Sequence, residues 1–184
     1  LPLDQFSETV KEIQPELVIL GAQQLTTAAT LEESARILSQ DNIPLAYSGR
    51  IFRTSPVLRE KISGYFLGET LPEVFQNAEN LLIQNPSAIF ADKDENPYKA
   101  LQEQFEIYFP TVHHHLMTTL IPFGSDQIPF DTLKNTFYEA NKFMSANILA
   151  ALQLGDLALL KAEFVWARTL IQNHGQTQVP IASY

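Results

Sequence analysis

Three short apolar runs, separated by segments with helical spacing, constrain the fold of this chain more than any other feature. The runs cover residues 16–21 (ELVILG), 43–47 (IPLAY) and 64–67 (GYFL). Short runs that are apolar on both faces are typical of strands buried inside a parallel sheet. Each run therefore predicts a strand.

Segments with a different period lie around these runs. Their apolar residues recur every three or four positions, which is the spacing of one helix face. The predicted helices cover residues 3–14, 30–40, 56–62 and 71–82. Thr70 and Glu73 have the spacing of a capping box at the start of the last one. Because helical crossovers join parallel strands, the expected class is α/β with an open parallel sheet.

The second half of the chain has a different character. Turn-forming and charged residues dominate 85–97, which predicts a linker after an α/β domain at 1–84. Residues 98–184 then predict a bundle of amphipathic helices. One helix starts at residue 98 and is kinked or interrupted by Pro110. Longer helical patterns follow at 130–154 and from 157 to about 171.

Composition excludes several classes of function. The 184 residues include 21 acidic and 12 basic ones, a net charge of −9. Such a surface repels phosphate backbones, so we expect no nucleic-acid binding. No apolar run approaches the roughly 20 residues that cross a bilayer. The chain has no cysteine, which excludes thiolate metal sites and fits a cytoplasmic protein.

Motifs for catalysis are missing from the sequence. It has no glycine-rich phosphate loop, no Gly-x-Ser-x-Gly and no His-Glu-x-x-His. Because the sequence shows no convincing acid–base pair or nucleophile, we predict that the chain has no catalytic residue and is not an enzyme.

Histidines and one tryptophan also stand out. The adjacent residues His113, His114 and His115 point about 100° apart on a helix, so they cannot converge on one metal ion. We predict no metal site there, but a solvated helix face or an inter-helix hydrogen-bond cluster, sensitive to pH. His174 suits a helix C-terminus as a cation, and Trp166 suits a core or an interface.

The carboxyl ends of the predicted strands are the expected place for a ligand. Small residues stand at all three strand ends, so that a ligand or a neighbouring backbone can approach closely; tight turns are the alternative interpretation. These ends are Gly21-Ala22-Gln23-Gln24, Ser48-Gly49-Arg50 and Gly68-Glu69. Arginines lie next to the second strand end and suit an anion, or else pair with Glu60 or Glu69. These arginines are Arg50, Arg53 and Arg59.

The stretch from residue 3 to about 83 resembles the later part of a cobalamin-binding domain, of the kind attached to MerR-type transcriptional regulators. The similarity lies in LPLDQFSETVKEIQPELVILGAQQLTTAATLEES and in IPLAYSGRIFRTSPVLREKISGYFLGETLPEVFQNAENLL. It implies a flavodoxin-like sheet whose first strands precede Leu1. It also implies that cobalamin, a corrinoid, is the ligand. The implied cofactor-binding residues are Gly21, Ala22, Thr26, Thr27, Ser48 and Gly49.

This sequence departs from that family at three points. The family's Asp-x-His-x-x-Gly motif, whose histidine ligates cobalt, is absent. Gly21 stands where the family has a serine that hydrogen-bonds the nucleotide base, and Thr26 and Thr27 are placed to replace that hydroxyl. Ser48 and Gly49 stand where the family has two glycines, so that a side chain is added against the nucleotide tail.

Two hypotheses follow for the function. The first is a sensory module of a regulator, without catalytic activity, in which corrinoid binding shifts the helical bundle or the oligomeric state. The second is a protein-interaction or oligomerisation scaffold of the same fold that binds no cofactor. Three strands alone leave an exposed sheet edge, so we expect either further elements before Leu1 or a homo-oligomer. The segment GDLALLKAEFVWARTLIQNHG is similar in texture to helices that flank such domains, which fits dimerisation or signal transmission.

Overall fold

A parallel sheet of three strands, in the order β1-β2-β3, organises the first half of the chain. The computed structural model describes residues 3–90, 96–120 and 130–173. Within them the strands are β1 (Val18–Gly21), β2 (Leu45–Ser48) and β3 (Tyr65–Phe66). The predicted α/β class with an open parallel sheet is confirmed.

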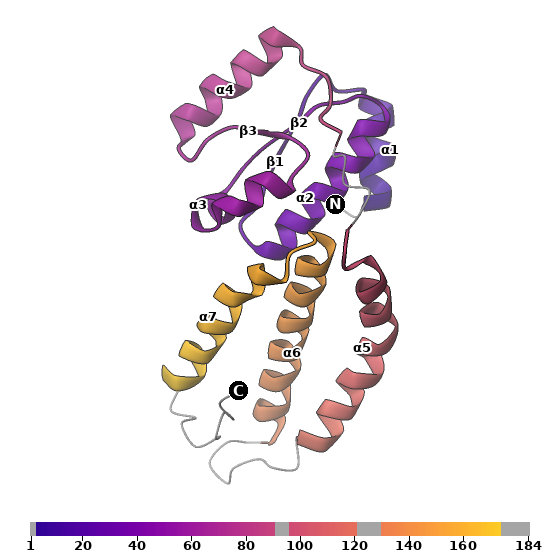
Figure 1. Ribbon diagram of the computed structural model, residues 1–184, viewed down its shortest axis with the longest axis vertical. Helices are drawn as coiled ribbons and strands as arrows, with labels where there is room; N and C mark the ends of the chain where they lie inside the picture. The colour runs from indigo at the N-terminus through magenta and orange to yellow at the C-terminus, as the bar shows by residue number, and fades with distance from the viewer. Residues whose placement is uncertain (1–2, 91–95, 121–129, 174–184) are drawn as a thin grey trace. The chain divides into compact units, whose positions relative to one another are not determined.

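Helices alternate with these strands in the predicted order (Figure 1). They are α1 (Leu3–Ile13), α2 (Leu25–Gln40), α3 (Arg50–Thr54), the 3-10 helix η1 (Pro56–Lys61) and α4 (Leu71–Gln84). The capping box predicted for α4 is present: the Glu73 carboxylate accepts from the backbone N–H groups of Glu69 and Thr70, at 2.8 and 3.1 Å. These two bonds lower the pKa of Glu73.

Two helices differ from the prediction. Helix α2 begins at Leu25 rather than residue 30, because Gln24 and Thr27 form a capping box at its start. The segment predicted as a helix at 56–62 is the 3-10 helix η1, and the short helix α3 precedes it. Five residues of α3 are too few to show a helical period.

One face of the sheet carries the core of this unit. Tyr47 of β2 packs against Phe52 of α3 and Phe66 of β3, with ring centroids 4.7 and 5.6 Å apart. The other large, fully buried side chains of this unit are Leu38, Leu45, Leu58 and Leu67. Strands that follow one another in a parallel sheet are joined by right-handed crossovers, so α2 and α3 cover the same face.

The outer side of β1 remains open in the part of the chain that the structure describes. Val18 and Ala22 donate their N–H groups to Pro44 and Ser48 of the β2 side, at 3.1 and 3.0 Å. Backbone groups alternate along a strand, so the N–H of Ile19 points away from β2. The Ile19 side chain is 50% exposed.

Helix α4 is the most weakly packed element of this unit. None of its residues is buried, and Leu71, Phe75, Leu82 and Ile83 are exposed. The segment after it is better anchored, since the Tyr65 hydroxyl donates to the Ser87 carbonyl at 2.9 Å and the Ala88 N–H donates to Asn42 at 3.2 Å.

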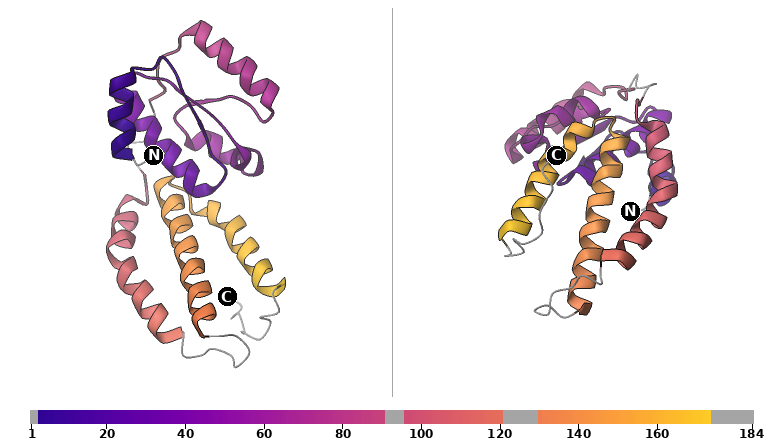
Figure 2. Two further views of the ribbon diagram at one scale, coloured as in Figure 1. Left: turned by 180° about the vertical axis from the view of Figure 1, so that it is seen from behind. Right: turned by 60° about the horizontal axis from the view of Figure 1, so that its bottom comes forward.

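The chain divides into two units between Pro97 and Tyr98. The second contains α5 (Lys99–Leu120), α6 (Phe130–Gln153), the 3-10 helix η3 (Leu157–Leu159) and α7 (Leu160–Asn173). Helix α6 packs against both α5 and α7 and lies between them (Figure 2). The predicted packing of C-terminal helices is confirmed.

Helix α5 continues through Pro110 instead of being interrupted there. Proline removes one hydrogen bond to the carbonyl four residues earlier, here that of Glu106. Both residues are exposed, so water can satisfy that carbonyl.

Candidate functional site

The loops that follow β1 and β2 meet at the carboxyl edge of the sheet. Ala22 is fully buried and donates its N–H to the Ser48 carbonyl at 3.0 Å. Gly49 lies directly against it: a Cβ added to Gly49 would stand 1.9 Å from the Ala22 carbonyl oxygen. Gly49 also has a φ of +139°. The structure therefore requires glycine at this position for the fold itself.

Gly21 differs from Gly49 although it ends the neighbouring strand. It is exposed, and a Cβ added there would meet only the Ser48 carbonyl oxygen, at 3.9 Å. The position has room for the serine that the family resemblance implies. Ser48 itself is half-buried beside it.

The two threonines at the start of α2 have different surroundings. The Thr27 hydroxyl accepts from the N–H groups of Gln23 and Gln24, at 3.1 and 3.0 Å, and donates to the Gln24 carbonyl at 2.8 Å. That hydroxyl is fully used by the helix cap. Thr26 is half-buried, and its hydroxyl has no hydrogen-bond partner in the described ranges. Of the two, Thr26 is the one free to contact a ligand.

The sequence left open whether Arg59 binds an anion or pairs with a carboxylate, and in the structure it pairs with Glu69. Its guanidinium contacts Glu69 at 2.5 Å and donates to the Phe52 carbonyl at 2.9 and 3.1 Å. It also lies over the Phe66 ring, 4.2 Å from the centroid. Arg59 therefore ties η1 to the end of β3.

The hydroxyl of the buried Tyr47 donates to the Arg59 carbonyl at 3.1 Å. Burial raises the pKa of Tyr47 to about 12, an effect that the Arg59 charge partly offsets and the Glu32 charge reinforces. Glu32 is itself buried and accepts from the N–H and hydroxyl of Ser63, at 2.6 and 2.8 Å. These polar groups are therefore hydrogen-bonded within the fold.

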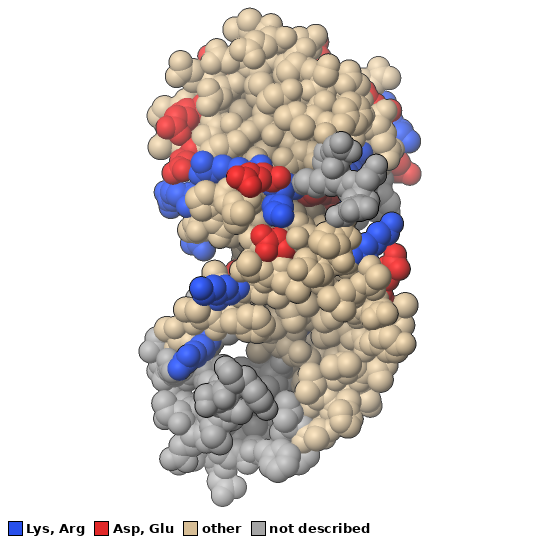
Figure 3. All heavy atoms as spheres, in the orientation of Figure 1, with Lys and Arg blue, Asp and Glu red and all other residues tan. Residues whose placement is uncertain are grey.

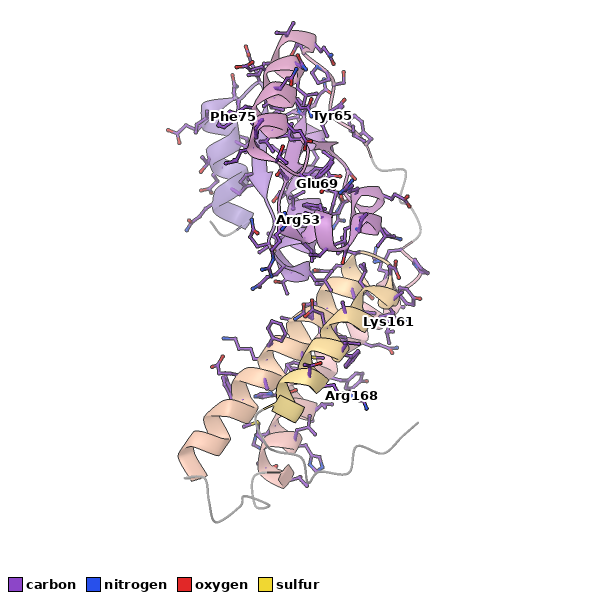
Figure 4. All side chains as sticks on the ribbon, turned by 90° about the vertical axis from the view of Figure 1, so that its left-hand side faces the viewer. Arg53, Tyr65, Glu69, Phe75, Lys161 and Arg168 are labelled. Atoms are coloured by element: carbon purple, nitrogen blue, oxygen red, sulfur yellow. The ribbon has the colours of Figure 1, made fainter. Side chains whose placement is uncertain are left out.

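Arg50 and Arg53 remain exposed on α3. Lysine and arginine side chains gather in this region of the α/β unit, with acidic groups close by (Figure 3). Figure 4 labels the side chains of Arg53 and Glu69, which both belong to this unit. Unlike Arg59, neither Arg50 nor Arg53 forms an ion pair or hydrogen bond through its side chain in the part of the chain that is described.

The three adjacent histidines do not act as a group. The His113 ring contacts the Asn141 amide of α6 at 2.6 Å and packs against Phe109 and Tyr138. His114 and His115 are exposed. The predicted inter-helix hydrogen bond is thus confirmed for His113, and the predicted solvated face for its two neighbours.

The search for metal and membrane sites gives no candidate among the described residues. No group of three His, Asp or Glu side chains in those ranges has the geometry to hold a metal ion. None of the helices described is both long and apolar enough to cross a membrane. The side chain of Trp166 and all of His174 lie outside the described residues.

Comparisons with known proteins identify no family. No protein-family model matches the chain. No curated protein matches it either.

Proposed function

We propose that this chain is a non-catalytic, cytoplasmic sensory module of a regulator, with its ligand bound over the carboxyl edge of the sheet. The observation that carries the proposal is the meeting of the loops after β1 and β2, where Ala22 and Gly49 are in contact. Around that contact Gly21 is exposed, and Thr26 and Ser48 are half-exposed. Carboxyl ends of parallel strands are where open α/β sheets bind ligands.

Cobalamin is the ligand that the family resemblance implies. The observed order of helices and strands is the one that the resemblance requires over residues 3–84. The same position that lacks the family's serine hydroxyl, Gly21, has open space above it. A corrinoid would act as a signal only if its affinity differed between two states of the helical half or of an oligomer.

The alternative is a scaffold of the same fold that binds no cofactor and serves protein interaction or oligomerisation. Three observations favour it. The Thr27 hydroxyl is used by the helix cap. The open side of β1 exposes Ile19, and α4 exposes Phe75 (Figure 4), which is 68% accessible. Exposed apolar surface of this kind suits a protein partner.

A titration with hydroxocobalamin, followed by gel filtration, separates the two functions. We expect red pigment in the protein peak of the wild-type chain and tighter binding by Gly21→Ser, which supplies the missing hydroxyl. Gly21→Trp should abolish binding because its ring covers the carboxyl edge. Ile13→Trp is the matched control, since Ile13 is exposed at the end of α1, before β1 begins.

A colourless wild-type peak would contradict the sensory proposal and favour the scaffold. Binding that is equal in Gly21→Trp and the wild type would place the corrinoid away from this edge. Light scattering on the same column fractions gives the oligomeric state with and without the corrinoid, and a pigment-independent dimer supports the scaffold.

A further inference from the structure

The segment from Arg50 to Lys61 is basic within an acidic chain. It carries three arginines and one lysine against a single acidic residue, Glu60, although the whole chain has a net charge of −9. Local positive charge of this kind raises the concentration of anions near it.

Two of these four cations are occupied by the fold. Arg59 is held by Glu69 and by the Phe52 carbonyl, and Lys61 has an interaction partner within the chain. Arg50 and Arg53 are exposed, and their side chains have no partner among the described residues. The free positive charge of the segment therefore resides on α3.

The positions of Arg50 and Arg53 bring both side chains to one place. They are three residues apart on a helix, so they lie on the same face. Helix α3 follows Gly49 directly, and Gly49 lies against Ala22 of the neighbouring loop. Helix α3 therefore places both residues beside the carboxyl edge of the sheet, where the proposed ligand binds.

We propose that Arg50 and Arg53 together bind the phosphate group of the ligand at this edge. The inference rests on the proposed function and names one chemical group of its ligand. A guanidinium presents several N–H donors in one plane and so can bind two phosphate oxygens at once. Two such groups on one helix face can bind a single phosphate together, because neither is occupied by a carboxylate among the described residues.

Calorimetric titration with inorganic pyrophosphate, at low ionic strength to limit screening, tests the assignment. We expect the Arg50→Gln/Arg53→Gln variant to bind at least about tenfold more weakly than the wild type, the loss typical of charge-assisted hydrogen bonds. Lys11→Gln/Arg168→Gln is the matched control, because it removes two exposed cations from α1 and α7 that form no ion pair among the described residues, and it changes the net charge equally. Circular dichroism checks that both variants fold.

A third variant separates charge from geometry. Arg50→Lys/Arg53→Lys keeps both charges and loses the planar fork, so we expect affinity between those of the wild type and the glutamine variant. Equal weakening in the two glutamine variants would reduce the effect to net charge and overturn the assignment, as would wild-type affinity in Arg50→Gln/Arg53→Gln. Absence of pyrophosphate binding by the wild type would overturn it too.

The assignment and the proposed function fail in different ways. Malonate, titrated in parallel, reports whether a carboxylate binds as well as a phosphate; tighter malonate binding would overturn the phosphate assignment.

If pyrophosphate binds through the arginines but hydroxocobalamin does not bind at all, the corrinoid proposal fails and the phosphate site stands. If hydroxocobalamin binds equally to wild type and Arg50→Gln/Arg53→Gln, the arginines do not serve that ligand and the inference fails alone.

Discussion

Strands β1 and β2 are neighbours of equal length, yet their surroundings differ. Leu45, Ala46 and Tyr47 of β2 are all buried, whereas Ile19 of β1 is half-exposed. The residue after β2, Gly49, is fixed by contact with Ala22, whereas Gly21 at the end of β1 has open space around it. Both strands have apolar sequences, so the position in the sheet decides which residues the fold depends on.

We expect the greatest loss of stability from a core substitution in β2, and a much smaller loss from the same kind of change in β1. Leu45 is 2% exposed, and Leu45→Ala should lower the free energy of unfolding by about 2–5 kcal/mol, because it leaves a cavity. Ile19→Ala should cost less than about 1 kcal/mol, since half of that side chain already contacts solvent. Urea denaturation followed by circular dichroism measures both.

Equal losses of stability at the two positions would contradict this prediction. They would mean that Ile19 is covered in solution, by another copy of the chain or by another segment. Repeating the Ile19→Ala measurement over a range of protein concentrations then identifies self-association, because the stability of a dimer depends on concentration.

The second test compares the glycines at the two strand ends. Gly49→Ala should cost about 1–3 kcal/mol, because alanine disfavours the positive φ and its methyl group would overlap the Ala22 carbonyl. Gly21→Ala should change stability by less than about 1 kcal/mol, with a stabilising sign, because the unfolded chain loses freedom while the native position has space. Thermal unfolding of both variants under one set of conditions gives the difference. A tolerated Gly49→Ala would show that the two loops are not in contact in solution.

The smallest effect appears only at high pH and concerns the buried tyrosine of β2. The pKa of Tyr47 rises from 10.0 to about 12 in the folded chain, so the folded state holds that proton more tightly than the unfolded state. Its contribution to stability is complete below pH 10 and is lost as the pH rises from 10 to about 12. Urea denaturation across this interval should show a smaller loss of stability for Tyr47→Phe than for the wild type. Identical curves would mean that Tyr47 is more open to solvent than a buried residue of β2 should be.

The sequence predicts most of this α/β unit because its signals are local. The apolar runs that become β1 and β2, and the Thr70–Glu73 cap of α4, each depend on residues close together in the chain. The sequence predicts a later start for helix α2, since the polar residues Thr26 and Thr27 obscure the apolar period of its first turn.

The sequence predicts where the candidate site lies but not which of its residues are in contact. The carboxyl ends of the strands follow from their order, but the contact between Ala22 and Gly49 joins residues that are distant in the sequence. The choice of Glu69 as the partner of Arg59 likewise depends on how η1 and the end of β3 are brought together. For the same reason, the sequence could not single out Arg50 and Arg53 as the arginines whose side chains have no partner among the described residues.

The buried bond between Glu32 and Ser63 has a consequence for how this unit folds. It joins positions 31 residues apart, and it forms only when α2 has docked and the chain has passed through β2 towards β3. Because closing a loop of this length costs chain entropy, we expect the contact to form late in assembly. Its energy would then act mainly on the unfolding rate, so that Glu32 governs how long the native state persists rather than how quickly it is reached.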